Sequence, residues 1–478
     1  MREELSLIID QGTHATRAMA VDREGRVRLS AFVPVSLFRL SDTHVEQNGE
    51  EILVSVERVV QQVLSEATTQ RLDLIRAGLA TQRSSVVAWD LKTGRPVSPV
   101  ISWQDRRVSR WLERFHDAGP EIQRLSGLPL SPHYGAGKLR WLFDNLAAVR
   151  AAWERETLAW GPLASFLLFH LLRESPYLID HANAQRTQLW NLQTRSWDTA
   201  LMTLFQLPSA LLPACRPVCS HYGRLKAADI PITVVSGDQN AAFYSLGNPS
   251  AGSARVNLGT GAFILLSTGA EPVFHARLLS GIAASSEKTA QYLLEGTVNG
   301  AGAALEWAGN TWRIPDLYQH LPDWLSRRSG VPVFMNAVGG IGSPWWCPEA
   351  GSYIVGDGSP WQRVVAVAES ILFLIQANLN TMIGCGCDIK RLTITGGLAR
   401  LDGLCRRLAD LTGKPVYRPA EIEATVRGTA WLAFDRPRHW PRPGRGRWFR
   451  PEINDALIDR YNLFCREMVE KVPGVLPQ

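Results

Sequence analysis

The sequence predicts an α/β protein built from two similar domains, and two observations carry this prediction. An apolar run leads into Asp10-Gln-Gly12-Thr13 and a second apolar run follows at once, which is typical of two strands joined by a tight turn. The same pattern recurs half a chain later at Asn257-Leu-Gly259-Thr260-Gly261. Between the two hairpins, strand-like and helix-like segments alternate, as they do in layered α/β folds.

The elements follow in order along the chain. Residues 50–67 carry apolar side chains at helical spacing and predict an amphipathic helix. Strands are expected at 74–80, 85–90 and 99–103. The stretch 246–253 lacks core-forming residues, so we expect the domain boundary there. After Phe434 the chain becomes rich in Pro and Arg, and a final helix is expected around 454–470.

Composition excludes several classes of protein. With 478 residues, of which 45% are hydrophobic and 20% charged, the chain is globular rather than disordered. No apolar run reaches about 18 residues without a charge or a breaker, and the longest candidate, 163–172, is too short to span a membrane. The first residues, Met1-Arg-Glu-Glu4, lack the apolar core of a secretory signal. We therefore expect no membrane partner.

The cysteines indicate the compartment. Seven cysteines are few for this length, and none has a second Cys or His pair at zinc-ligand spacing. They are interpreted as buried or incidental thiols in a reducing, cytoplasmic setting.

The net charge of +6 comes from one segment. Residues 436–450 hold six arginines and no acidic residue, so the rest of the chain is neutral. The interleaved Trp440 and Trp448 allow a nucleic-acid contact. A solvated connector that packs its aromatics on the second domain is the favoured interpretation, and we expect no nucleic-acid partner.

Each Gly-Thr turn presents backbone N–H groups and a hydroxyl that can hold phosphate oxygens. Asp10, at the end of its strand, can hold Mg²⁺ directly or through water. One copy alone is more simply a hairpin that needed glycine, but two copies in corresponding places favour a phosphate site.

Three further segments have alternative interpretations. Asp238 follows an apolar strand where a helix begins; the local sequence favours an N-cap, and the alternative is a carboxylate that accepts the proton of an attacking hydroxyl. Residues 81–84 and 101–107 follow strands, where α/β folds display binding groups, but surface loops explain them equally well. The diglycine Gly396-Gly397 is either a ligand-approach site or a tight turn.

Taken together, these segments resemble the FGGY family of carbohydrate kinases, and the glycerol kinase branch most closely. The collinear motifs are Asp10-Gln-Gly-Thr, Gln82-Arg83, Trp103-Gln-Asp-Arg-Arg107, Lys138-Leu-Arg-Trp141, Asn183-Ala-Gln-Arg186, Gly237-Asp238-Gln239, Gly259-Thr-Gly261, Leu294-Glu-Gly296, Gly340-Ile-Gly-Ser-Pro-Trp-Trp346 and Gly396-Gly397. The resemblance implies an α/β fold of two actin-like (ribonuclease H-like, ASKHA) domains flanking a catalytic cleft. Residues 1–247 would bind the acceptor and hold the base, 253–434 would bind ATP, and 435–478 would form the connector and the C-terminal helix.

The resemblance also implies a role for each matching residue. Asp238 would be the general base, and Asp10 would lie near Mg²⁺. The acceptor, a small sugar or polyol, would be bordered by Gln82, Arg83, Ser84, Trp103, His133, Gln239 and Phe263. ATP would be bound by Thr13, Arg17, Thr260, Gly261, Gly302, Glu306 and Gly397, with Gly302 and Gly397 giving room for the nucleotide.

The chain departs from the glycerol kinases at several of these positions. Ser84 stands where they have a Glu that accepts hydrogen bonds from polyol hydroxyls, and His133 stands where they have a substrate-contacting Tyr. His14 replaces a Thr or Ser, and Leu401 lies near the place of an Asn beside adenine. Because buried hydrogen-bonding sites discriminate strongly among hydroxylated ligands, glycerol itself is in doubt.

The alternatives are therefore a ketose kinase, such as a xylulokinase or ribulokinase, and a nucleotide-dependent sugar sensor or ATPase. Retention of Asp10, Thr13, Asp238 and Thr260 favours an enzyme. The resemblance is also compatible with a homo-oligomer.

Overall fold

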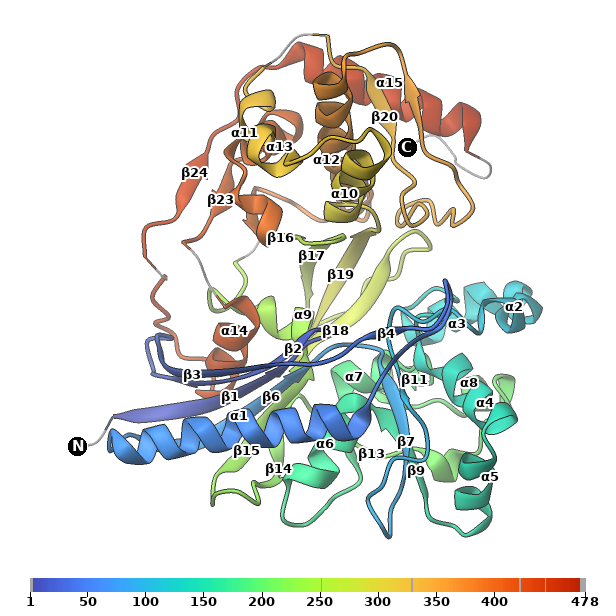
Figure 1. Ribbon diagram of the computed structural model, residues 1–478, viewed down its shortest axis with the longest axis vertical. Coiled ribbons are helices and arrows are strands. Elements are labelled where there is room, and N and C mark those ends of the chain that lie inside the picture. Colours follow the sequence, from blue (N-terminus) through green and yellow to red (C-terminus); the bar gives the residue numbers. More distant parts are fainter. Residues whose placement is uncertain (1–2, 251, 328–329, 421–422, 443, 473–478) are drawn as a thin grey trace.

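The computed structural model describes residues 3–250, 252–327, 330–420, 423–442 and 444–472. Within these ranges the first half of the chain, blue to green in Figure 1, gathers around one main β-sheet, and the second half, yellow to red, gathers around another.

The first sheet begins with the predicted hairpin. β1 (Glu4–Gln11) pairs antiparallel with β2 (Ala15–Val21), and β2 pairs antiparallel with β3 (Val27–Pro34). β6 (Asp73–Thr81) runs parallel to β1, and β15 (Pro231–Gly237) runs parallel to β6, with β14 (Cys219–Arg224) at the edge. Because β1, β6 and β15 are parallel, their carboxyl ends lie at the same edge of the sheet.

The second sheet repeats this arrangement. β16 (Ser253–Leu258), β17 (Ala262–Gly269) and β19 (Ala290–Val298) are antiparallel neighbours, and β22 (Arg391–Thr395) and β23 (Val416–Arg418) follow in parallel from β16. β18 (Leu279–Ser285) and β24 (Arg447–Phe449) complete the two edges. The repeat predicted from the two Gly-Thr turns is thus confirmed in three dimensions.

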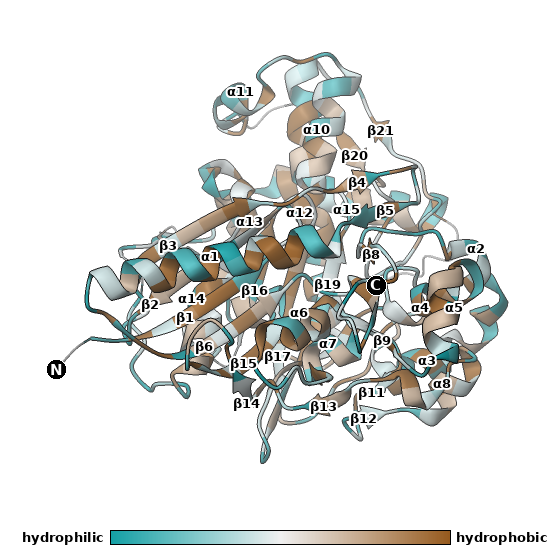
Figure 2. Cartoon of the chain, turned by 60° about the horizontal axis from the view of Figure 1, so that its bottom comes forward, coloured by the Kyte–Doolittle hydropathy of each residue, from teal (hydrophilic) through white to brown (hydrophobic). Residues whose placement is uncertain are grey.

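The predicted helix at 50–67 is α1 (Gly49–Thr69). Asn48 caps it, because its side chain accepts hydrogen bonds from the backbone N–H groups of Glu50 and Glu51. The helix packs on β2 and β3 and buries one apolar stripe, while its other face is polar (Figure 2). The buried residues are Gly49, Ile52, Ser55, Val56, Val59, Val60, Val63 and Ala67.

A smaller mixed region extends the first half. Its sheet has the order β4 (Phe38–Arg39), β5 (Val45–Gln47), β8 (Val100–Ile101), β7 (Val86–Asp90) and β9 (Leu158–Pro162), which confirms the strand expected at 85–90 and shortens the one expected at 99–103. Its two-stranded sheets are β10 (Leu178–Asp180) with β13 (Ala214–Arg216), and β11 (Trp190–Asn191) with β12 (Ser196–Trp197).

The remaining helices cover these sheets. In the first half they are α2 (Ser109–Leu112), η1 (Glu113–Ala118), α3 (Gly119–Ser126), α4 (Gly135–Asn145), α5 (Ala147–Glu154), α6 (Leu163–Leu171), α7 (His181–Gln185), α8 (Thr199–Leu204), η2 (Ser209–Leu211) and α9 (Asp238–Ala242). In the second half they are α10 (Gly302–Thr311), α11 (Leu317–Trp324), α12 (Pro360–Gly384), η3 (Gly397–Arg400), α13 (Asp402–Thr412), α14 (Ala424–Ala433) and α15 (Asp455–Lys471), with the small β20 (Val333–Met335) and β21 (Tyr353–Val355) pair.

The two halves share a core. α14 belongs to the second half of the sequence, yet it lies against β1, β6 and α9 of the first (Figure 1). Trp431 of α14 stacks on Tyr244, and Ile282 of β18 and Leu293 of β19 join the same apolar cluster. The second half is therefore attached to the first by buried apolar side chains and not only by the chain connection.

Among the described residues, α12 is the one helix whose length and composition would allow it to cross a membrane. Glu369 interrupts the apolar run of this helix, so the sequence criterion of an uncharged run does not select it. Of its most apolar window, 83% is buried inside the protein, where Glu369 pairs with Arg407 and Arg460. α12 is thus a core helix of the second half.

The Arg-rich connector is only partly as expected. Trp448 packs on Tyr417 of the second half, and β24 adds a strand beside β23. The same packing is expected of Trp440 and holds only in part: its ring lies under Arg427 of α14, but its indole N–H donates to the carbonyl of Ser245, and the side chain joins the core of the first half. The aromatic ring is accommodated there because α14 has already crossed to that side. The expected C-terminal helix is confirmed as α15.

Candidate functional site

The parallel strand ends bring together acidic residues that are distant in sequence. Asp10 is the penultimate residue of β1 and Asp238 directly follows β15, and the two carboxylates repel each other. Burial, repulsion by Asp238 and repulsion by Glu423 raise the pKa of Asp10 to about 7, although Arg17 opposes the shift. Arg17 is the cross-strand neighbour of Asp10 and donates a 2.7 Å hydrogen bond to Glu423. Two arginines face these three carboxylates, Arg17 beside Asp10 and Glu423, and Arg83 beside Asp238, so an excess of negative charge remains.

Asp238 is the first residue of α9, and Gly237 takes the N-cap position. Oδ1 of Asp238 accepts a 2.7 Å hydrogen bond from the N–H of Gln239, and about a quarter of the side chain stays exposed, 27%. Burial raises the pKa of Asp238, and the charge of Arg83, 3.9 Å away, lowers it in part. The N-cap position that the local sequence favours for Asp238 is therefore taken by Gly237, and the Asp238 carboxylate stays partly exposed.

Arg83 connects the two halves of the chain. Its guanidinium forms a two-pronged pair with Glu295 of β19, at 2.8 and 3.0 Å, and Arg186 donates a third hydrogen bond to Glu295 at 2.5 Å. Burial alone would raise the pKa of Glu295, but the two arginines lower it to about 2. Phe263 lies under the Arg83 guanidinium, 5.9 Å from its ring centroid. Arg83 is thereby fixed between Asp238 and the second sheet.

Ser84, Trp103 and His133 form a connected wall beside Arg83. Ser84 has φ of 65°, a left-handed conformation that is strained for a residue with a side chain and is typical of functional sites. Nδ1 of His133 donates to the carbonyl of Trp103 at 2.9 Å, and burial lowers the pKa of His133 to about 4. The indole N–H of Trp103 donates to Oγ1 of Thr13 at 3.0 Å. His133 is therefore neutral with Nε2 as an acceptor, and the wall is joined to the first Gly-Thr turn.

Of the two glutamines predicted to border the acceptor, Gln82 is buried among the strand ends of the first half, whereas Gln239 contacts the second hairpin. Gln82 is buried, and its amide is engaged by Gln11, Gln47 and Ser85, so it ties the strand ends together behind the wall. Gln239 is half-buried and accepts a 3.3 Å hydrogen bond from Asn257, the counterpart of Asp10 in the second hairpin. Gln239 thus joins α9 to the second hairpin.

The second hairpin carries the start of α10. The N–H groups of Ala301 and Ala303 donate to the carbonyl of Thr260, and that of Gly302 donates to the carbonyl of Gly259. A Cβ at Gly302 would lie 2.9 Å from that oxygen, so this glycine lets α10 dock closely on the turn. Gly397 opens η3, and a Cβ there would meet nothing within 4 Å. Thr260 and Glu306 are exposed, and Gly261 closes the turn beside them.

Within the described ranges, no group of three or more His, Cys, Asp or Glu side chains could hold a metal ion by itself. The donors at Asp10 nevertheless fit Mg²⁺, which prefers oxygen ligands and commonly takes one or two carboxylates plus substrate phosphates. The seven cysteines all lie in the described ranges, and none of them forms a disulfide.

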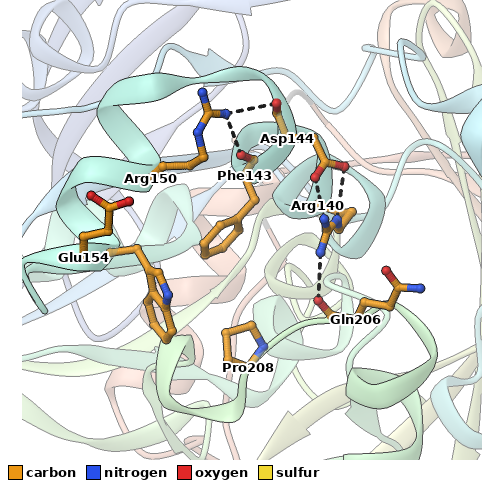
Figure 3. A pocket seen from close by; sticks show the side chains of 8 residues that line it. Arg140, Phe143, Asp144, Arg150, Glu154, Gln206 and Pro208 are labelled. Atoms are coloured by element: carbon orange, nitrogen blue, oxygen red, sulfur yellow. Dashed lines mark hydrogen bonds and ion pairs between the residues drawn. The ribbon is translucent and has the colours of Figure 1, made fainter.

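A hollow of about 600 Å³ lies elsewhere, between α4, α5 and the segment 206–208 (Figure 3). Arg140 and Arg150 line it, but they donate to Asp144, Phe143 and Gln206 around its rim. None of the predicted site residues lines this hollow.

Several residues of the site had no predicted role. Glu295, Arg186 and Lys138 lie inside motifs that the sequence displayed, so their position in those motifs was the available signal. Glu423 gave no signal, because its contact with Arg17 joins residues 406 positions apart.

Comparison with known proteins agrees with this geometry. Residues 5–243 match the N-terminal domain of the FGGY family of carbohydrate kinases, and residues 254–434 match its C-terminal domain. A glycerol kinase of Polaromonas naphthalenivorans is 34% identical over 451 residues, 89% of each protein. A glycerol kinase structure from Plasmodium falciparum, with ADP, has a TM-score of 0.90 at 23% identity over 99% of both chains. A ligand-bound xylulose kinase from Lactobacillus acidophilus has a TM-score of 0.85 at 19% identity, over 98% of this chain and 99% of that one.

The chain belongs to the FGGY family of carbohydrate kinases, and it is similar to the glycerol kinases within it. It is a phosphotransferase with an alcohol group as acceptor, and the predicted fold of two actin-like domains is confirmed.

Proposed function

We propose that the protein transfers the γ-phosphoryl group of ATP to a hydroxyl of a small sugar or polyol, with Asp238 as the general base. The observation that carries this proposal is the convergence of Asp238, Asp10 and Arg83 at the strand ends beside the two Gly-Thr turns. Asp238 is partly exposed and has a pKa raised by burial, which makes it a stronger proton acceptor than an ordinary aspartate.

The first domain would hold the acceptor. Arg83, Ser84, Trp103 and His133 would border it, with Gln239 and Phe263 on the side of the second hairpin and Gln82 supporting the wall from behind. As the acceptor oxygen attacks phosphorus, its proton passes to Asp238 and the bond from phosphorus to the ADP oxygen breaks.

The second domain would hold ATP. The turn with Thr260 and Gly261 would contact phosphate from one side, and Thr13 and Arg17 from the other. The open space at Gly397 and the exposed Glu306 would border the rest of the nucleotide. Mg²⁺ at Asp10 would supply charge neutralisation of the phosphates; the excess negative charge there supports this assignment.

The experiment is a coupled ADP-release assay over glycerol, erythritol, xylitol, ribitol, xylulose and ribulose. We expect ATP turnover that requires one of these acceptors. Turnover without any acceptor would instead support an ATPase, and nucleotide binding without turnover would support a sugar sensor.

A ketose kinase is the second candidate. Ser84 and neutral His133 favour it, because they replace the carboxylate and phenol expected for glycerol and leave a shorter side chain at each position. Faster turnover of xylulose or ribulose than of glycerol would select this alternative. We place the enzyme in the cytoplasm, since none of its seven cysteines forms a disulfide.

A further inference from the structure

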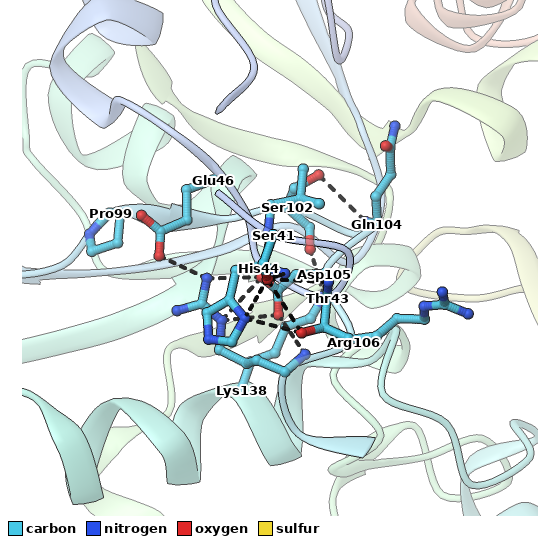
Figure 4. Close-up of polar contacts among 12 residues, drawn as sticks. Ser41, Thr43, His44, Glu46, Pro99, Ser102, Gln104, Asp105, Arg106 and Lys138 are labelled. Carbon is cyan, nitrogen blue, oxygen red and sulfur yellow. Dashed lines mark hydrogen bonds and ion pairs between the residues drawn. The ribbon is translucent and has the colours of Figure 1, made fainter. Parts of the chain in front are cut away.

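Lys138 is completely buried beneath the wall formed by Ser84, Trp103 and His133. It extends from α4 toward the loop that carries Ser102 (Figure 4). Its ammonium donates to three backbone carbonyls: that of Ser84 at 3.2 Å, that of Ser102 at 2.8 Å and that of His133 at 2.8 Å. These three hydrogen bonds use all of its N–H groups.

The stability of the fold does not explain why the charged ammonium of Lys138 is buried beneath the wall. Among the described residues, no carboxylate forms an ion pair with Lys138, because the nearby Asp105 gives its oxygens to Arg107 and to the N–H of Val45. Taking such an ion out of water costs several kcal/mol, and an apolar side chain of similar volume is often no less stable. Burial accordingly lowers the pKa of Lys138 to about 7.

The three carbonyls have one property in common. Each belongs to a separate loop that carries a residue of the wall: Ser84 itself, Ser102 directly before Trp103, and His133 itself. The loops come from different parts of the chain and meet at this ammonium. The strained conformation of Ser84 needs such a partner, since a left-handed residue persists only when its surroundings hold it.

We propose that Lys138 is a positioning residue that fixes these three loops around the acceptor hydroxyls. The proposal rests on the proposed function, in which the wall borders the acceptor. Lys138 itself has no donor left for a substrate, so it acts through the backbone of Ser84, Ser102 and His133. It sets the binding of the acceptor and leaves the nucleotide side unaffected.

The test is Lys138→Met in the full chain, assayed with whichever polyol or ketose of the panel turns over fastest. We expect the KM for that acceptor to rise on the order of 10²-fold, as for a displacement of about 1 Å at a reacting group. The KM for ATP should stay close to that of the parent protein, while the melting temperature should fall, because three buried carbonyls lose their donor. Lys138→Arg, which keeps the charge and the donors, should recover part of the acceptor affinity.

Lys226→Met, at an exposed lysine of the same domain, is the matched control and should change none of these quantities. An unchanged acceptor KM in Lys138→Met would overturn the proposal. An equal rise in both KM values would also overturn it, because that is the result of a purely structural role.

If Lys138→Met does not fold, Lys138→Gln takes its place, since it keeps donors for two carbonyls, and the same criteria apply. A parent protein that turns over no acceptor of the panel contradicts the proposed function. If the parent protein is active and the Lys138 variant has an unchanged KM for the acceptor, only the proposed role of Lys138 is contradicted.

Discussion

Asp238 and Arg83 lie close enough for their charges to act on each other, and the protonation of Asp238 depends on that contact. Burial raises the pKa of the Asp238 carboxyl, and the Arg83 guanidinium 3.9 Å away lowers it. Since Arg83 is itself held by Glu295, its distance from Asp238 is set by the second sheet. The strength of the base is thus adjusted by a residue whose position depends on both domains.

This contact makes a prediction about pH dependence. A general base works only when deprotonated, so the rate should fall as the pH drops through the pKa of Asp238. Arg83→Met removes the positive charge that lowers this pKa, and the acid limb should therefore move to higher pH. The measurement is kcat/KM against pH at saturating Mg²⁺, so that the protonation of Asp10 contributes little. Arg173→Met, at an exposed arginine, is the control, and an acid limb that stays in place would refute the assignment.

At the scale of residues, the sequence predicts the position of a single side chain better than it predicts the side chains that contact it. Asp10 and Asp238 could be predicted because each follows an apolar strand at a recognisable turn. The contacts of Glu295 could not, because they join it to Arg186 and Arg83 over 109 and 212 positions. Only the folded sheets bring these side chains together.

At the scale of elements, the second hairpin, α10 and η3 form the side of the molecule that we propose binds the nucleotide. α10 docks directly on the turn through backbone hydrogen bonds to Gly259 and Thr260. η3 begins at Gly397 with open space where a side chain would stand. Gly302 and Gly397 were expected to play the same role, but glycine is needed for a different reason at each position. At Gly302 it allows close packing of α10 on the turn, and at Gly397 it leaves open space for a ligand.

A pair of valine substitutions separates these reasons. Gly397→Val should leave the melting temperature unchanged and raise the KM for ATP on the order of tenfold, which corresponds to about 1.4 kcal/mol. Gly302→Val should destabilise the fold by about 1–3 kcal/mol, because its side chain would press on the backbone of Gly259. Thermal unfolding and initial-rate kinetics measure both effects. A destabilised Gly397→Val with normal ATP affinity would contradict this distinction.

The elements themselves were largely predictable. α1, β6, β7 and α15 follow from periodicity and turn residues, as does the repeat of the two hairpins. The half of the molecule against which an element packs is harder to predict from the sequence. α14 and Trp440 pack on the first half because the crossing of α14 is fixed by apolar contacts far along the chain.

At the scale of the whole molecule, the two halves meet through a shared apolar cluster and one buried ionic group. Glu295 of the second half lies between Arg83 and Arg186 of the first, with an exposed fraction of 1%. An unpaired charge there would be costly, so the three side chains stabilise the arrangement only as a complete set.

Glu295→Gln should lower the free energy of unfolding by about 3–5 kcal/mol, because it leaves two buried arginines without their carboxylate. Chemical denaturation measures this loss. Asp144→Asn, which breaks an exposed pair with Arg140, should cost no more than about 1 kcal/mol. Equal effects of the two substitutions would show that the buried group does not hold the halves together.

The same carboxylate predicts how stability depends on pH. The folded-state pKa of Glu295, about 2, lies below its ordinary value of 4.5. A group with a lowered pKa stabilises the fold above its ordinary value, and this contribution is lost as the pH falls toward the folded-state value. The parent protein should therefore lose stability between about pH 4.5 and 2. Glu295→Gln should show a smaller loss over that interval, and an identical loss would exclude Glu295 as its source.

The central claim is that Asp238 accepts the proton of the acceptor hydroxyl, and Asp238→Asn tests it most directly. Asn keeps the size of the side chain and removes the base. The measurement is ADP release in the presence of the best acceptor, with thermal unfolding as the check on folding. We predict a kcat lower by about 10²–10⁴-fold with an unchanged fold. A folded Asp238→Asn variant with a near-normal kcat would contradict the account.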